Sequence, residues 1–290
     1  MSEMHLAIAD LLASRRRVEY IRHSIVYFIL TILGITFVFP LFWMITTSLK
    51  TPPQQVALPP VWIPNPPIWA NYPEALTAYP YGTYLSNTLT ICASTVLGTV
   101  ISCGLAAYGF SQISWPGRDI VFTLVLATLM LPYPVTMIPT FILFHHIGWV
   151  DTFLPLIVPS YFGNAFYIFL LRQFFMTQPR ELCDAARVDG CSEFGIFLRI
   201  MVPLARPAFA TVALFQFIDG WNDLLGPLIY LNSEDKFTLA LGLQQFVSAY
   251  GSSWGHMMAA ATTFTLPIVV LFFMTQRTFI QGIALTGLKA

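Results

Sequence analysis

Residues 181–190, ELCDAARVDG, form a short polar segment between two long apolar segments, and this placement predicts a chain that crosses a membrane on both sides of the segment. The polar segment continues to Pro203, and the apolar segments 153–175 and 204–230 flank it. Each flanking segment exceeds the roughly 20 residues that a helix needs to cross a bilayer. We therefore expect a loop outside the membrane that holds a small-residue helix and a tight Asp-Gly turn, an arrangement typical of a docking surface.

Composition places the whole chain among polytopic membrane proteins. Of its 290 residues 56% are apolar and 10% are charged, with a mean hydropathy of +0.69, whereas about 25% of residues are charged in an average soluble domain. The net charge is zero, which leaves no electrostatic footprint for nucleic acid. The four cysteines have neither CxxC spacing nor a zinc-site pattern, so we expect free thiols and no metal site.

Gaps between charged residues predict an all-α fold with six membrane-spanning helices. No charged residue falls between Arg22 and Lys50, and this run exceeds the about 7–15 apolar residues of a signal peptide, so we expect a retained helix. The predicted spans are 24–46, 84–110, 119–144, 153–175, 204–230 and 257–279. The predicted segments are a cytosolic N-terminus (1–23), a first helix with its external loop (24–83), a five-helix domain (84–279) and a cytosolic tail (280–290).

Basic residues predict the orientation of these spans. With a cytosolic N-terminus, 12 Lys and Arg residues fall on the inside and 2 on the outside, as the positive-inside rule requires. The loop 178–203 and both termini are then cytosolic, and 50–82 is external. The external loop holds nine of the 21 prolines, so we expect it to be extended rather than helical. It either receives an external partner or packs over the helix ends.

The sequence around 181–190 predicts two helices joined by a turn. Pro179 and Glu181 suit a first helical turn, Gly190 can end the helix with positive φ, and Ser192 can cap the next helix. Ala185 with Asp189, and Ala186 with Gly190, are four apart and carry little bulk. The alternative is an amphipathic helix on the lipid surface. That alternative requires large apolar residues along one face, whereas the middle of this helix consists of alanine, aspartate and arginine. We therefore favour protein docking.

Asp184-Ala185-Ala186-Arg187-Val188-Asp189-Gly190, followed by Phe197 and Pro203-Leu204, resembles the EAA loop of binding-protein-dependent ABC importer permeases. Further resemblance to the carbohydrate branch of these permeases lies in Asn87, Leu131-Pro132, FLLRQF (169–174), WND (221–223), Gln276-Arg277 and GIALTG (282–287). The resemblance covers nearly the whole chain and is greatest to the six-helix, maltose-permease-type second subunit. Asp184 stands where the family usually has glutamate. Aspartate keeps the negative charge, but its side chain is shorter.

This resemblance implies the transmembrane domain of a type I ABC importer in a bacterial inner membrane. Its partners would be a second, non-identical permease, two ATPase subunits and an extracytoplasmic sugar-binding protein. The EAA helix would lie in a cleft on the ATPase, and the C-terminal tail would reach between the two ATPases. The implied coupling residues are Glu181, Asp184, Ala185, Ala186, Asp189 and Gly190, and the implied tail contacts are Gly282, Thr286 and Gly287.

The sequence around each lysine is consistent with ATP hydrolysis on a separate subunit. None of Lys50, Lys236 and Lys289 lies in a Gly-x-x-x-x-Gly-Lys-Ser/Thr motif, the sequence that cradles nucleotide phosphates. We therefore expect no cofactor on this chain and no enzymatic activity of its own. ATP and magnesium would bind the partner ATPase.

Two carboxylates, Asp219 and Asp223, fall within a predicted span. A carboxylate at the centre of a span costs about 2.5–3.5 kcal/mol on insertion scales, so it should face protein or water. Sugars suit amide and carboxylate acceptors beside aromatic rings. The candidate substrate path is Asn87, Asn164, Asp219, Trp221, Asn222 and Asp223. Alternatively the span ends early or tilts, and the two acids have a structural role at its external end.

Three function classes compete. A subunit of an ATP-driven sugar importer is favoured by the EAA-type loop. An ion-coupled carrier would use Asp219 and Asp223 as its relay. An intramembrane enzyme would need a nucleophile or metal motif, and neither HExxH nor GxSxG is present.

Overall fold

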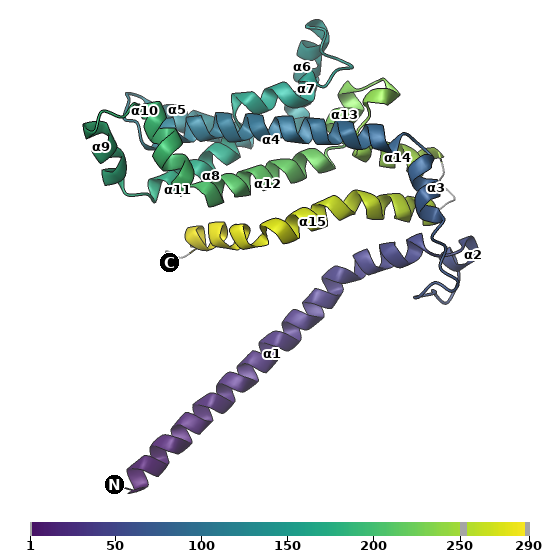
Figure 1. The fold of residues 1–290 in the computed structure, drawn as a ribbon, viewed down its shortest axis with the longest axis horizontal. Coiled ribbons are helices and arrows are strands. Elements are labelled where there is room, and N and C mark those ends of the chain that lie inside the picture. The colour runs from purple at the N-terminus through teal and green to yellow at the C-terminus, as the bar shows by residue number, and fades with distance from the viewer. Residues whose placement is uncertain (1, 250–253, 288–290) are drawn as a thin grey trace. The chain divides into compact units, whose positions relative to one another are not determined.

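The computed structural model describes residues 2–249 and 254–287, with side chains for 19–244 and 254–276. Within these ranges helices are the only regular secondary structure (Figure 1). Two compact units are distinguished, Met1–Ala75 with Ser252–Thr262 and Leu76–Gly251 with Thr263–Ala290. The helices are α1 Ser2–Ser48, α2 Pro52–Gln55, α3 Asn71–Thr77, α4 Tyr81–Ser111, α5 Arg118–Ala127, η1 Thr128–Met130, α6 Tyr133–His146, α7 Leu154–Ile157, η2 Val158–Phe162, α8 Ala165–Met176, α9 Arg180–Val188, α10 Glu193–Ile196, η3 Phe197–Met201, α11 Val202–Leu204, α12 Arg206–Asn222, α13 Leu225–Tyr230, η4 Glu234–Lys236, α14 Leu239–Ala249 and α15 Trp254–Gly287.

The predicted all-α membrane fold is confirmed, with up to six spans among the described residues. Four helical segments are long and apolar enough to cross a membrane: Glu19–Ser48, Tyr81–Ser111, Leu154–Met176 and Trp254–Gln276. Two bent pairs complete the set: Arg118–Met130 with Tyr133–His146, and Glu193–Leu204 with Arg206–Asn222.

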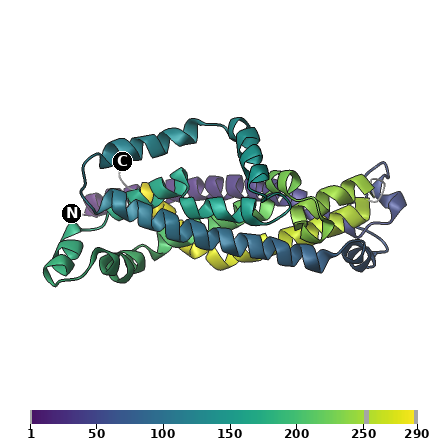
Figure 2. The same cartoon turned by 90° about the horizontal axis from the view of Figure 1, so that it is seen from above.

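The third predicted span, 119–144, is broken rather than continuous. Its halves meet at 98°, and they form an arch beside α4 (Figure 2). Leu131 is extended, with φ −84° and ψ 112°, and Pro132 caps α6. A residue before proline is disfavoured in the α conformation, so the Leu131-Pro132 pair accounts for the break.

The fifth predicted span, 204–230, is also divided. Helix α12 ends at Asn222, and Asp223 follows in an extended conformation with ψ 111°. Asp223 Oδ1 accepts the backbone N–H of Gly226 at 3.0 Å, which begins the separate short helix α13. Helix α12 therefore ends before Asp223, as in the alternative of a span that ends early, and Asp219 and Asp223 do not lie on one continuous helix.

The larger unit is organised around α4, which packs along α12 and α8 (Figure 1). Its core includes Cys103, Leu171, Phe175 and Val212, each fully buried. A Cβ on Gly104 would lie 2.8 Å from the Phe209 ring, so glycine at this position permits the close approach of α12. Helices α9 and α10 lie near one end of α4, and α13 and α14 lie near the other.

The smaller unit contains most of the proline-rich loop. This loop was predicted to be extended, but it contains two short helices. Helix α2 forms because Thr51 and Gln54 make a capping box, and α3 follows at Asn71–Thr77. Asn71 Nδ2 donates to the carbonyl of Ser48 at 2.7 Å. The loop therefore packs against the end of α1, as a cap over a helix end does.

Candidate functional site

The predicted docking loop folds as α9, α10, η3 and α11. Helix α9 begins directly after Pro179 and has Glu181 in its first turn. Gly190, at φ 80°, ends this region with the positive φ that glycine adopts without strain. Ser192 Oγ accepts the N–H of Gly195 at 3.2 Å and caps α10. The predicted helix, turn and second cap are confirmed.

One face of α9 is anchored to the core of the larger unit. Cys183 is buried, and its Sγ lies 3.6 Å from Sδ of Met201. Ala186, three residues further along, packs against the same core cluster. Ile196 of α10 and Phe197 of η3 are buried in this cluster as well. The loop is therefore held by apolar packing to α4 and α12 rather than resting free at the surface.

Arg187 is the polar centre of this loop. Its Nε donates to Oε1 of Glu193 at 2.7 Å, and Nη1 donates to Oδ1 of Asp184 at 2.7 Å. Nη2 reaches Glu193 Oε2 at 3.2 Å and the carbonyl of Gln112 at 3.3 Å. Tyr108 Oη donates to Glu193 Oε2 at 2.6 Å. One guanidinium thus ties α9 both to α10 and to the end of α4.

These contacts shift the titration of both partners in the pair. The hydrogen bond from Arg187 is the largest cause that lowers the pKa of Glu193 below 4.5. The same bond raises the pKa of Arg187 above its ordinary value. Both groups are consequently charged at neutral pH. The Arg187–Glu193 pair was not predicted from the sequence, although residues of opposite charge on either side of the Gly190 turn were a signal for it.

The opposite face of α9 is exposed. It carries Glu181 and Ala185, the residues Asp189 and Gly190 that follow the helix are also exposed, and the side chain of Asp184 is 65% exposed. Five of the six predicted coupling residues are thus accessible, whereas Ala186 faces the core. Leu182 and Val188 are exposed at 45% and 88%. Exposed apolar side chains beside acidic and small residues suit a partner's surface, and their presence was not anticipated.

A second candidate site is a cavity of about 800 Å³ in the larger unit. Asn164, Asp219, Asn222 and Asp223, all predicted path residues, line it. The other lining residues are Ile91, Thr95, Tyr133, Leu156, Gln216, Ile218, Gly220 and Leu225. Gln216 could have been found as an amide within a span one turn before Asp219. Thr95 and Tyr133 carried no such signal, because α4 and α6 are distant from α12 in sequence.

The polar groups of this cavity also hold the fold. Tyr167 Oη donates to Asp219 Oδ2 at 2.7 Å, which links α8 to α12. Asn164 Oδ1 caps α8 by accepting the N–H of Phe166 at 2.9 Å. Asn222 Nδ2 donates to the Ile218 carbonyl at 2.8 Å. The polar side chains that line the cavity therefore also hold α8 and α12 in place.

The remaining predicted path residues lie elsewhere. Trp221 is fully buried, and its Nε1 donates to the Phe264 carbonyl at 3.1 Å. Asn87 Nδ2 donates to the carbonyls of Asp235 and Phe237 at 2.8 and 3.0 Å. Both side chains fasten helices or loops and are not among the residues that line the cavity.

Two further predictions concern the tail and metal binding. Helix α15 extends to Gly287, but the side chains at Gly282, Thr286 and Gly287 lie outside the described residues. Within the described part of the chain, no three His, Cys, Asp or Glu residues are grouped as metal ligands.

Comparison with known proteins places these features in a family. The family described as "Binding-protein-dependent transport system inner membrane component" matches residues 95–284. The chain is 36% identical over 209 residues to the arabinooligosaccharides transport system permease protein AraQ of Bacillus subtilis (strain 168), covering 72% of this chain and 74% of that protein. It is 32% identical over 256 residues to the lactose transport system permease protein LacG of Rhizobium radiobacter, covering 88% and 93%.

The fold is also similar to that of a solved structure. A bacterial ABC transporter involved in the import of the acidic polysaccharide alginate contains a chain that matches with a TM-score of 0.79. The match covers 91% of this chain and 98% of that chain at 22% identity. At this identity the likeness is one of fold.

Proposed function

Because the chain belongs to the family of binding-protein-dependent transport system inner membrane components, we propose that it is a permease subunit of an ATP-driven importer for a sugar, polyol or short oligosaccharide. The relatives named for arabinooligosaccharides and lactose support this substrate class. In this role the chain forms half of a translocation pore with a second permease. It carries out no covalent chemistry.

The exposed face of α9 is the proposed contact with a separate ATPase. Support comes from its acidic and small residues, from the exposed Val188, and from the Arg187 contacts that join α9 to α4. A force on a helix is transmitted only if the helix is rigidly attached to the membrane-spanning helices. This loop is attached to them by apolar packing and by the contacts of Arg187. ATP and magnesium bind the ATPase, and Gly282, Thr286 and Gly287 are proposed as tail contacts with it.

The cavity at Asp219 and Asp223 is the proposed part of the sugar path. Its carboxylate and amide oxygens suit hydroxyl groups, and two of the lining acids are fixed by neighbouring hydrogen bonds. We propose that the cavity is open to a sugar in one state of the transport cycle. An extracytoplasmic binding protein would deliver the sugar, and the loop 178–203 and both termini would lie in the cytoplasm of a bacterial cell.

The proposed function is tested by transport in a reconstituted system. The complex is purified through a tag on this chain, and its binding protein is screened against sugars by thermal shift to identify the ligand. Uptake of that ligand into proteoliposomes is then measured with and without ATP, and with and without a proton gradient. Uptake should require ATP and be indifferent to the gradient. Gradient-driven uptake without ATP would favour the ion-coupled carrier that uses Asp219 and Asp223.

A further inference from the structure

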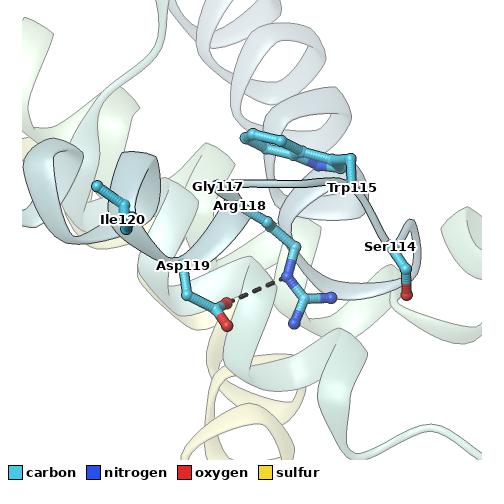
Figure 3. Close-up of a pocket in the computed structure, with 6 residues that line it drawn as sticks. All are labelled: Ser114, Trp115, Gly117, Arg118, Asp119 and Ile120. Carbon is cyan, nitrogen blue, oxygen red and sulfur yellow. Dashed lines mark hydrogen bonds and ion pairs between the residues drawn. The ribbon is translucent and has the colours of Figure 1, made fainter.

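A pocket at the beginning of α5 is separate from both candidate sites. It has a volume of about 330 Å³ and is lined by Ser114, Trp115, Gly117, Arg118, Asp119 and Ile120 (Figure 3). Gly117, at φ 82°, lets the chain turn from the end of α4 into α5. The pocket therefore lies where an apolar spanning helix meets a polar connecting loop.

The charge around this pocket is positive on balance. Arg118 Nε lies 3.1 Å from Asp119 Oδ1, and Arg172 Nη2 lies 3.8 Å from the same oxygen. The side chain of Asp119 is 74% exposed, whereas those of Arg118 and Arg172 are 22% and 13% exposed. Two guanidinium groups thus share one carboxylate, which leaves one positive charge for a further anion.

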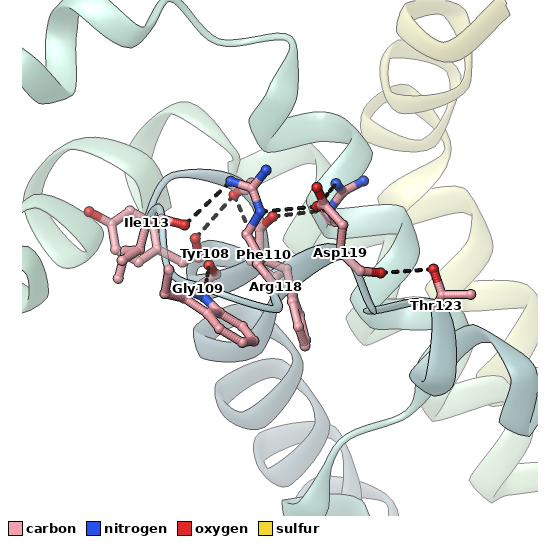
Figure 4. A network of polar contacts seen from close by, with 11 residues as sticks. Tyr108, Gly109, Phe110, Ile113, Arg118, Asp119 and Thr123 are labelled. Carbon is pink, nitrogen blue, oxygen red and sulfur yellow. Dashed lines mark hydrogen bonds and ion pairs between the residues drawn. The ribbon is translucent and has the colours of Figure 1, made fainter. Parts of the chain in front are cut away.

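Both guanidinium groups are held in place by the end of α4. Arg118 Nη1 donates to the Ile113 carbonyl at 3.4 Å (Figure 4). Arg172 Nε donates to the Phe110 carbonyl at 3.1 Å. Within the described residues, Nη2 of Arg118 makes no hydrogen bond of its own. Arginine binds phosphate oxygens through such N–H groups, and the side chain is already ordered before any ligand arrives.

An apolar surface begins at the same pocket. Ile120 and Leu124 are four residues apart in α5, which places them along one face of this helix. Ile120 and Leu124 are 70% and 62% exposed. Trp115 lies at the pocket edge, with its Nε1 bonded to the Gly109 carbonyl at 3.1 Å, and tryptophan is enriched at membrane–water interfaces.

We propose that this pocket binds the phosphate of an anionic phospholipid, with Arg118 contacting the headgroup and the acyl chains lying along Ile120 and Leu124. A soluble anion would satisfy the arginine but leave the apolar face of α5 uncovered. A phospholipid covers both features at once. Basic pockets beside membrane helices bind anionic headgroups by the same combination of charge and apolar surface. The site does not depend on the proposed import function.

The test is native mass spectrometry of the delipidated full-length chain with three added probes. Phosphatidylglycerol, phosphatidylcholine and inorganic phosphate are titrated separately into the wild type and into Arg118→Gln, Arg118→Lys and Arg199→Gln. Arg199 is an exposed arginine of the loop between α9 and α12, so it is the matched control. Circular dichroism checks that each variant retains its helices.

Phosphatidylglycerol should bind the wild type in preference to phosphatidylcholine. Arg118→Gln should weaken that binding roughly fivefold, as expected for one basic residue near an anionic headgroup. Arg118→Lys should be intermediate, and Arg199→Gln should be unchanged. Equal binding of both lipids, or equal losses in Arg118→Gln and Arg199→Gln, would overturn the proposal. Displacement of phosphatidylglycerol by millimolar phosphate would identify a soluble-anion site and also overturn it.

Discussion

The loop around α9 and the cavity beside α12 are built in opposite ways. The loop draws its proposed contact surface from one continuous stretch, and its main ion pair joins residues six apart, Arg187 and Glu193. The cavity draws on α4, α6, α7, the cap of α8, α12 and the start of α13. A surface made of neighbours in sequence can dock a partner as one rigid piece. A space made from many helices changes shape when those helices move, which suits a transport path.

Gly190→Glu tests the loop side of this comparison and should have the largest effect. A Cβ at Gly190 would meet nothing within 4 Å, so the new side chain has room and obstructs the docking face, while the φ of 80° adds backbone strain. Co-purification with the ATPase should be lost. Gly148→Glu is the matched control, since Gly148 also has a positive φ, 74°, and open space. Loss in both variants would attribute the effect to backbone strain, and normal co-purification of Gly190→Glu would contradict docking.

Arg187→Gln should uncouple the loop from α4 without removing the docking face. Hydrogen bonds to charged groups contribute about 1.5–3 kcal/mol, and less here because the pair is partly exposed. Uptake should fall about tenfold, a change of about 1.4 kcal/mol in the barrier, while the ATPase still co-purifies. The double variant Arg187→Glu with Glu193→Arg should regain part of the uptake. Wild-type uptake by Arg187→Gln would show that apolar packing alone joins the loop to α4.

Asp223 distinguishes a path role from a structural role at the cavity. Asp223→Asn keeps a side-chain oxygen for the Gly226 N–H and removes the charge, whereas Asp223→Ala removes both. If the charge contacts the sugar, both variants should lower uptake several-fold, by about 1 kcal/mol, and assembly should remain intact. Wild-type uptake by Asp223→Asn together with poor assembly of Asp223→Ala would assign the residue to helix capping.

The Arg187–Glu193 pair predicts a dependence of stability on pH. Because the pKa of Glu193 is lowered in the folded chain, its contribution is fully present above the ordinary value of 4.5 and is lost as pH falls through the lowered value. Thermal unfolding in detergent between pH 7 and pH 3 should therefore show a step below pH 4.5 that is smaller in Glu193→Gln. Identical pH profiles for the wild type and Glu193→Gln would show that the pair does not stabilise the folded chain.

Trp221→Phe should have the smallest effect on transport. Because Trp221 is buried and bonds to the Phe264 carbonyl, its replacement should lower the free energy of unfolding by about 1 kcal/mol or somewhat more. The concentration of sugar at half-maximal uptake should not change. A marked change in that concentration would indicate that Trp221 contacts the sugar.

Features set by neighbouring residues could be predicted from the sequence, and features set by tertiary packing could not. The helix at α9, its Gly190 end and the Ser192 cap were predictable, because capping chemistry is local. The break at Leu131-Pro132 was missed, since a proline within a span can be tolerated by a bundle or can divide it. The inward turn of Ala186 and the separate places of Trp221 and Asn87 depend on tertiary packing. The Tyr167–Asp219 contact joins residues 52 apart, beyond the reach of spacing arguments.

The exposed face of α9 is proposed to lie in the cytoplasm against the ATPase, and the accessibility of position 188 tests this placement. Val188 is 88% exposed, so a Val188→Cys variant in a Cys191→Ser background can be labelled with a membrane-impermeant maleimide. We expect labelling in inside-out vesicles stripped of the ATPase, protection when the ATPase is added back, and no labelling in intact cells. Labelling from outside intact cells, or labelling that the ATPase does not change, would contradict it.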